Sequence, residues 1–188
     1  MEAFEEAAVR RCQEGDGAAF GELYDAHIKK IYDFIYYKTL HRETAEDLTS
    51  VTFTKAFEKI RSFKSHEGSF SAWLYRIARN TVIDHYRTRK FERDIDDVWD
   101  LSSHEDIARD ADVRLKLERV EQLLEKLTNE QRDIVIMRLW QDMAHADIAA
   151  ALGKNESAVK VAYSRAMKQL RQDVPGLAAL LAFLHSLS

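Results

Sequence analysis

The chain has 188 residues, of which 46% are hydrophobic, and a net charge of −4, so it is long enough for one large or two small domains with real cores. Six glycines, one proline and one cysteine favour an all-helical protein and exclude a disulfide framework or a cysteine-rich zinc site. The histidines show no HExxH-type pair and no apolar run approaches the ~20 residues that span a bilayer, so we expect no metal, no cofactor, no membrane span and a cytoplasmic location.

Apolar residues at helical spacing predict three amphipathic helices in the first third of the chain. We expect them at residues 4–14, 18–40 and 43–61. In the second and third helices the predicted inward residues are Phe20, Leu23, Tyr24, Ile28, Ile31, Ile35, Leu48, Val51, Phe53, Phe57 and Ile60. The segment FKSHEGS (63–69) reads as a loop, and Ser69 can cap the helix that follows it.

The stretch SFSAWLYRIARNTVIDHYRTRK (69–90) predicts a long helix with two unlike faces. The core face is predicted to hold Phe70, Trp73, Leu74, Ile77, Ala78 and Thr81. The other face is predicted to hold Arg76, Asn80, Asp84 and Arg87, with Arg79, Tyr75 and Tyr86 near its edges. This mixture of arginine, amide and aromatic groups can hold phosphate and also address a base.

Charge alternates along the chain. Residues 61–90 carry seven Lys/Arg against two Asp/Glu, residues 91–113 carry two against nine, and residues 153–173 carry five against two. Two basic helical segments separated by an acidic stretch fit two nucleic-acid-facing modules and a flexible linker. Ordinary charged helix surface explains the same charges equally well.

The second half of the chain carries a helix-turn-helix pattern. Thr128 and Gln131 match a capping box, which opens a helix reaching Trp140. After it come a helix at 145–152, a turn at Gly153 and a helix at 155–170, with Ile148, Leu152, Val159 and Ala162 as the shared core and Ala149 allowing a close crossing. Asn155 can cap the last helix. Lys154 departs from the pattern, because an apolar residue is usual there.

Three segments in order resemble the extracytoplasmic-function (ECF, group 4) sigma factors of bacterial RNA polymerase, in the sigma-70 family. They are TAEDLTSVTFTKAFEKI, SFSAWLYRIARNTVIDHYRTRK and LEKLTNEQRDIVIMRLW continued by DIAAALGKNESAVKVAYSRAMKQLR, and they span most of residues 18–173. The resemblance implies an all-α protein with two small helical domains, at 1–91 and 113–174, joined by an acidic flexible linker at 92–112 and followed by an apolar tail at 175–188. It implies a non-enzymatic factor that binds core polymerase, reads the −10 and −35 promoter elements and opens the −10 duplex.

The resemblance also implies residue roles. For the −10 non-template strand these are Ser65, His66, Phe70, Trp73, Arg76, Arg79, Asn80, Asp84 and Arg87, with Asn80 reading an extruded base. For the −35 element they are Glu156, Ser157, Lys160, Val161, Ser164, Arg165, Lys168 and Arg171. Asp47, Leu48, Thr49 and Phe53 would contact the clamp helices of core polymerase, and the helix at 128–140 its flap tip. An anti-sigma factor is a common partner in this family.

Several alternatives remain open from the sequence. Trp73 and Phe53 suit a core as well as an interface, Tyr75 and Tyr86 suit half-buried surface positions as well as base stacking, and Asp84 suits orienting a neighbouring side chain. The tail GLAALLAFLHSLS (176–188) suits packing on its own domain, or docking between domains or on a partner. The alternative function classes are a two-domain regulator that binds DNA without polymerase, and a helical enzyme, for which no catalytic constellation is visible.

Overall fold

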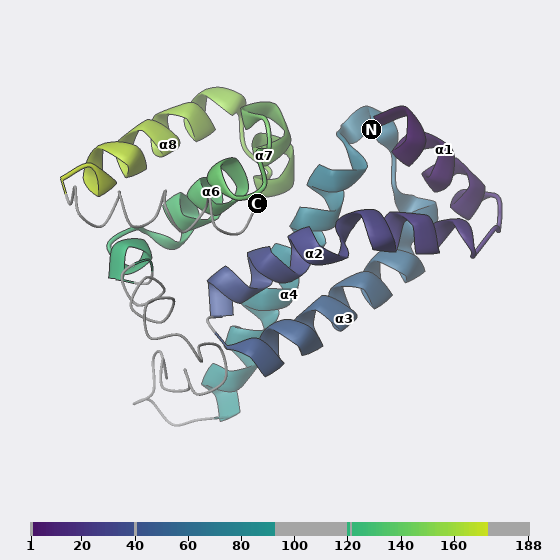
Figure 1. Ribbon diagram of the computed structural model, residues 1–188, viewed down its shortest axis with the longest axis horizontal. Coiled ribbons are helices and arrows are strands. Elements are labelled where there is room, and N and C mark those ends of the chain that lie inside the picture. Colours follow the sequence, from purple (N-terminus) through teal and green to yellow (C-terminus); the bar gives the residue numbers. More distant parts are fainter. Residues whose placement is uncertain (1, 40, 93–119, 121, 173–188) are drawn as a thin grey trace, which may run out of the picture. The chain divides into compact units, whose positions relative to one another are not determined.

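The computed structural model describes residues 2–39, 41–92, 120 and 122–172 (Figure 1). Within these residues every regular element is helical, which confirms the predicted all-α class. The chain divides into two compact units, residues 1–103 with 150–153, and residues 104–149 with 154–188. The predicted linker (92–112) lies outside the described residues except for its first position, and so does the predicted tail (175–188).

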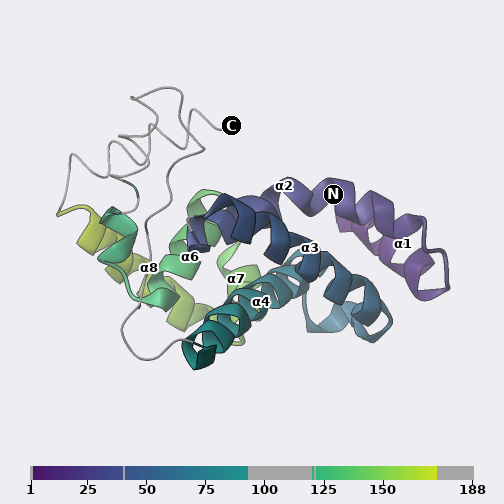
Figure 2. The ribbon, with the colours of Figure 1, turned by 90° about the horizontal axis from the view of Figure 1, so that it is seen from below.

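The first unit is a bundle of four α-helices. These are α1 (Glu2–Gln13), α2 (Ala19–Thr39), α3 (Arg42–Lys59) and α4 (Phe70–Glu92). Helices α2, α3 and α4 pack on one another, and α1 packs on α2 (Figures 1 and 2). Two short 3₁₀ turns, η1 (Ile60–Ser62) and η2 (Ser65–Glu67), lie between α3 and α4. The four helices predicted from periodicity are therefore confirmed, with bounds shifted by a few residues at most.

Local chemistry accounts for where α4 begins. The Ala72 N–H donates to the Ser69 hydroxyl at 3.2 Å, which confirms Ser69 as the predicted cap. Gly68, just before it, has a φ of +140°, a conformation that residues with a Cβ rarely adopt. The glycine therefore lets the chain turn sharply out of η2 and enter the helix.

The core of the first unit confirms most of the predicted inward residues and corrects a few. Phe20, Leu23, Ile31, Ile35, Leu48, Phe53 and Ile60 are buried as predicted, and Ile28 is half-buried. Tyr24, Val51 and Phe57 were predicted to face inward but are exposed. At 100° per residue, Val51 and Phe57 lie roughly 100–140° around α3 from the centre of its buried side. The apolar residues of α3 thus cover more of its circumference than the packing can bury.

The second unit contains α6 (Asn129–Leu139), α8 (Glu156–Leu170) and the part of α7 (His145–Leu152) that precedes Ala150. The capping box of α6 is confirmed: the Gln131 N–H donates to the Thr128 hydroxyl at 3.2 Å, and the Thr128 N–H donates to the Gln131 side chain at 3.0 Å. Helices α6 and α8 pack together.

The core between the helices of the second unit is slightly displaced from the predicted one. Ile148 and Val159 are buried as predicted, while Leu152 and Ala162 are only half-buried. Ala166 and Leu170, about two and three turns beyond Val159 along α8, are buried as well. The apolar stripe of α8 therefore runs towards its C-terminus, which leaves more of the N-terminal half of the helix exposed than the pattern predicts.

Thr128→Ala should lower the free energy of unfolding of the second unit by about 1 kcal/mol, because one orphan N–H of α6 loses its acceptor. Hydrogen exchange of the α6 amides measures this loss. Thr54→Ala is the matched control, because the exposed Thr54 hydroxyl only donates back to the Ser50 carbonyl of its own helix. Equal exchange in both variants would contradict the capping role.

Candidate nucleic-acid interface

Helix α4 has one buried side and one exposed side, as its sequence predicts. Phe70, Leu74, Ala78, Thr81 and Val82 are buried. Opposite them, Asn80 and Arg87 are exposed, while Arg76, Arg79 and Asp84 are half-buried. Burial of the apolar side fixes the rotation of the helix about its axis, so the polar side chains are held outward together.

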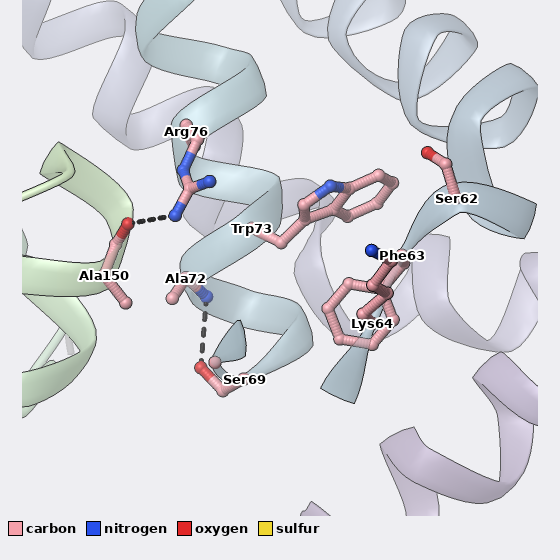
Figure 3. Close-up of a pocket in the computed structure, with 9 residues that line it drawn as sticks. Ser62, Phe63, Lys64, Ser69, Ala72, Trp73, Arg76 and Ala150 are labelled. Carbon is pink, nitrogen blue, oxygen red and sulfur yellow. Dashed lines mark hydrogen bonds between the residues drawn. The ribbon is translucent and has the colours of Figure 1, made fainter. Parts of the chain in front are cut away.

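An aromatic cluster fixes the first turn of α4. Phe63, Phe70 and Trp73 form it, with ring centroids 5.8 Å apart for Phe63 and Phe70, 5.4 Å for Phe63 and Trp73, and 5.6 Å for Phe70 and Trp73. Figure 3 shows two of its members, Phe63 and Trp73. Phe63 and Phe70 are buried, and Trp73 is half-buried. The ring of Phe70 lies in the core beside Trp73, and a direct contact of Phe70 with DNA stays a prediction. The ring contacts of Trp73 support its core role, and its interface role stays a prediction.

The loop before α4 presents polar groups beside this cluster. Ser65 and His66 are exposed on η2, as their predicted role requires. Ser62 and Lys64 line the same pocket as Trp73 (Figure 3). Sequence reasoning missed Ser62 and Lys64, and no motif marks them, because they come near Trp73 only through the turn that η1 makes.

The structure places Tyr75 in the core, which neither of its two alternatives predicted, and pairs Asp84 with Arg87. Tyr75 is 1% exposed and lies edge-on to Phe34, and burial raises the pKa of its phenol well above the ordinary value. It belongs to the core and is not available to stack on a base. Asp84 Oδ1 lies 3.0 Å from Arg87 Nη2, so Asp84 orients that guanidinium. Tyr86 remains exposed.

The residues of α3 predicted to contact core polymerase divide into one exposed and three buried positions. Asp47 is exposed. Leu48, Thr49 and Phe53 are buried, and the Thr49 hydroxyl donates to the Ala45 carbonyl at 2.6 Å. These three side chains present little surface to a partner, and their contact with core polymerase stays a prediction. The apolar side chains that α3 does expose are Val51 and Phe57.

In the second unit, α7 and α8 form the predicted helix-turn-helix. Gly153 has a φ of +66°, and Asn155 caps α8 by accepting from the Ala158 N–H at 2.7 Å. All the predicted recognition residues are exposed: Glu156, Ser157, Lys160, Val161, Ser164, Arg165, Lys168 and Arg171. The side of α8 turned away from the core therefore carries cations, hydroxyls and one apolar side chain.

Two ion pairs shape the charge of this surface. Lys160 Nζ lies 2.6 Å from Glu156 Oε1, and its hydrogen bond and charge lower the pKa of that carboxyl. Glu156 is thus an ionised acceptor whose charge offsets Lys160. Lys154 Nζ lies 2.8 Å from Glu130 Oε2 at the start of α6, which explains how a lysine is accommodated at a position where an apolar residue is usual.

Neither a metal-binding cluster nor a membrane-spanning helix occurs in the described part of the chain. There, no three or more histidine, cysteine, aspartate and glutamate side chains are grouped to hold a metal ion. None of the helices described is long and apolar enough to cross a membrane.

A long helix with an outward polar side and a separate helix-turn-helix define a two-module, DNA-binding class of transcription factor. Residues 23–92 match the family model for Sigma-70 region 2, and residues 117–170 match the model for Sigma-70 region 4. The RNA polymerase sigma factor YlaC of Bacillus subtilis is 30% identical, over 81% of this chain and 90% of its own length. The chain therefore belongs to the ECF RNA polymerase sigma factors of the sigma-70 family, which direct transcription initiation at promoters.

Other proteins similar to the chain agree with this assignment. The ECF RNA polymerase sigma factor BldN of Streptomyces coelicolor is 36% identical over 89% of this chain, which spans 64% of the length of BldN. The ECF sigma factor SigW of Bacillus subtilis is 27% identical over 94% of this chain and 100% of its own length. CnrH, solved with the cytosolic domain of CnrY, shares the fold with a TM-score of 0.72 at 24% identity, covering 92% of this chain and 97% of CnrH.

The Lys154–Glu130 pair should be weak and dependent on salt. Both side chains are about 40% exposed, so a double-mutant cycle of Lys154→Ala and Glu130→Ala should give a coupling energy of about 0.2–1 kcal/mol that falls as salt is added. Chemical unfolding at low and high salt measures it. A coupling energy of zero at low salt would show that the pair does not hold the turn against α6.

Proposed function

We propose that the protein is a group 4 sigma factor that opens promoters by capturing an extruded −10 base against the outer side of α4. The observation that carries this proposal is the exposure of Asn80 on a helix whose opposite side is buried. An amide presents both a donor and an acceptor, so it can read the edge of an unpaired base. The matched segments, regions 2 and 4, are those that the group 4 resemblance implies.

Base capture needs a surface whose contacts with the extruded base offset the free energy lost on unstacking it. Extruding a base costs roughly a few kcal/mol, which a neutral helix surface does not return. Ser65 and His66 supply exposed polar groups, and the half-buried Trp73 supplies a partly exposed aromatic ring. Arg76, Arg79 and Arg87 lie along the same helix and would hold the phosphates of the strand, with an affinity that falls as salt rises.

Helix α8 would read the −35 element in the major groove. Ser157, Val161 and Ser164 lie on its outward side, within the first turns of the helix. In helix-turn-helix proteins the N-terminal part of the recognition helix meets base edges. Lys168 and Arg171 lie further along and suit phosphate contacts. Glu156, already ionised beside Lys160, can accept from a cytosine amino group.

Core polymerase would bind the outward side of α3, and its flap tip would bind α6. Asp47 offers a charge there, and the exposed Val51 and Phe57 offer apolar area that a partner can bury. A cytoplasmic, non-enzymatic factor is part of the proposal. So is an anti-sigma partner: the sigma factor RpoE of Bartonella quintana was solved with the anti-sigma factor NepR. The joining role of the acidic linker at 92–112, and the packing or docking of the tail at 176–188, remain predictions.

Run-off transcription by core polymerase, with and without this protein, tests the proposal. Asn80→Ala should slow promoter opening about tenfold, because a good base contact is worth about 1–3 kcal/mol, and should leave core binding unchanged. Asp25→Ala, an exposed substitution on α2, is the control. A gel shift in which the protein binds promoter DNA equally well without core polymerase would support the two-domain regulator instead. Full activity of the Asn80 variant would reject the base-reading role.

Val161 should contact a thymine methyl group. Its side chain is 49% exposed among the hydroxyls and charges of α8, and an apolar side chain in the major groove pairs with that methyl group. Replacing −35 thymines by uracil one at a time should weaken promoter binding by holoenzyme at one position. Val161→Ala should remove that sensitivity, while Ser164→Ala should keep it. Equal binding of every uracil-substituted promoter by the unmodified protein would contradict this contact.

A further inference from the structure

Helix α1 precedes the segment that matches Sigma-70 region 2, yet its last residue holds the loop before α4. The Gln13 side-chain Nε2 donates to the Ile60 carbonyl at 3.0 Å and to the Phe63 carbonyl at 2.9 Å. These acceptors lie 47 and 50 residues further along the chain. One side chain therefore links α1 to both ends of the turn that leads out of α3.

The chemistry of these contacts fixes how Gln13 is oriented. Backbone carbonyls only accept hydrogen bonds, so the amide must present its NH₂ group to them, and both of its hydrogens are used. The Ile60 carbonyl also accepts from the Phe63 N–H at 3.1 Å, which closes η1. Gln13 thus bonds to the first carbonyl of the turn and to the carbonyl just after it.

The position of Phe63 determines where the neighbouring side chains of the candidate site lie. Its ring belongs to the aromatic cluster and contacts both Phe70 and Trp73. Its carbonyl is the point from which the chain continues into Lys64, Ser65 and His66. A shift of the Phe63 backbone would therefore move the half-buried Trp73 ring and the exposed polar loop together.

Contacts near both ends of α1 hold this helix against α2, so the backbone that carries Gln13 is held in place. Arg11 contacts Asp16 at 2.7 Å and Glu22 at 2.8 Å, which ties the end of α1 to the start of α2. Near the other end of α1, Glu5 Oε1 lies 3.2 Å from His27 Nε2, and both side chains are buried. The His27 ring in turn lies 5.5 Å from the ring of Phe70.

We propose that Gln13 is a positioning residue for −10 recognition, holding the loop at 63–69 and the Trp73 ring in the geometry that selects the extruded base. The inference rests on the proposed function, because it assumes that this loop and ring meet the base. Gln13 is half-buried and acts through the Phe63 backbone, so it need not touch DNA.

Gln13→Glu tests the inference with almost no change of shape. The carboxylate lacks both donors and faces two carbonyl oxygens, so the turn should loosen. The double variant Gln13→Glu/Glu14→Gln keeps the net charge of the protein, and Glu14→Gln alone is the matched control on the exposed neighbour. The readout is the ratio of opening rates on promoters with the preferred base and with each other base at the extruded −10 position.

Both Gln13→Glu variants should reduce this ratio about tenfold, the effect of two lost hydrogen bonds of ordinary strength, and Glu14→Gln should not. Core binding and −35 recognition should stay unchanged. Hydrogen exchange of the amides at 64–69 should be faster in the same two variants. Equal slowing on all promoters, together with lower thermal stability, would overturn the inference by reducing Gln13 to a purely structural role.

Ser65→Ala and His66→Ala, measured in the same assay, distinguish failure of the positioning role of Gln13 from failure of the proposed function. If they change the base preference and the Gln13→Glu variants do not, the positioning role is rejected and the proposed function stands. If neither set of variants changes the preference, the loop does not meet the base, and the proposed function fails together with the inference.

Discussion

Packing of Phe70 against Phe63 and Trp73 is the contact on which the candidate site depends. A helix is stiff, so fixing its first turn fixes the direction of every side chain along it. The cluster buries the apolar side of α4 at its beginning, and Leu74 and Ala78 continue that burial. Asn80 is exposed for this reason, at a set distance along the helix from Trp73. The polar side of α4 is therefore a consequence of core packing, and DNA is not needed to arrange it.

In the second unit, a few capping contacts fix where the helices begin, and so they orient the outward surface of α8. The Thr128 and Gln131 box begins α6, and Asn155 begins α8 immediately after the left-handed Gly153. With Val159 buried beneath it, α8 can present its cations and Val161 only outward. The Lys160–Glu156 pair then partly offsets the positive charge of that surface.

Periodicity and capping residues predicted the helices, the helix-turn-helix and the exposed recognition surfaces, because these features depend on local sequence. The width of the buried side of a helix does not depend on local sequence alone. Val51 and Phe57 are as apolar as their buried neighbours, and only the placement of α2 and α4 decides that they stay exposed. Tyr75 is buried for the converse reason, since Phe34 comes from another helix to cover it. The role of Gln13 was beyond prediction, because its acceptors are backbone carbonyls and leave no side-chain pattern to read.

The central claim is that one −10 base leaves the stack and is held beside α4. Fluorescence of 2-aminopurine, placed at each non-template −10 position in turn, tests this directly in the complex of core polymerase, this protein and promoter DNA, because the probe brightens when it unstacks. The account predicts a strong increase at one position, with an intensity different from that of the probe free in single-stranded DNA. An equal increase at every −10 position, or none at any position while run-off transcript still forms, would contradict it.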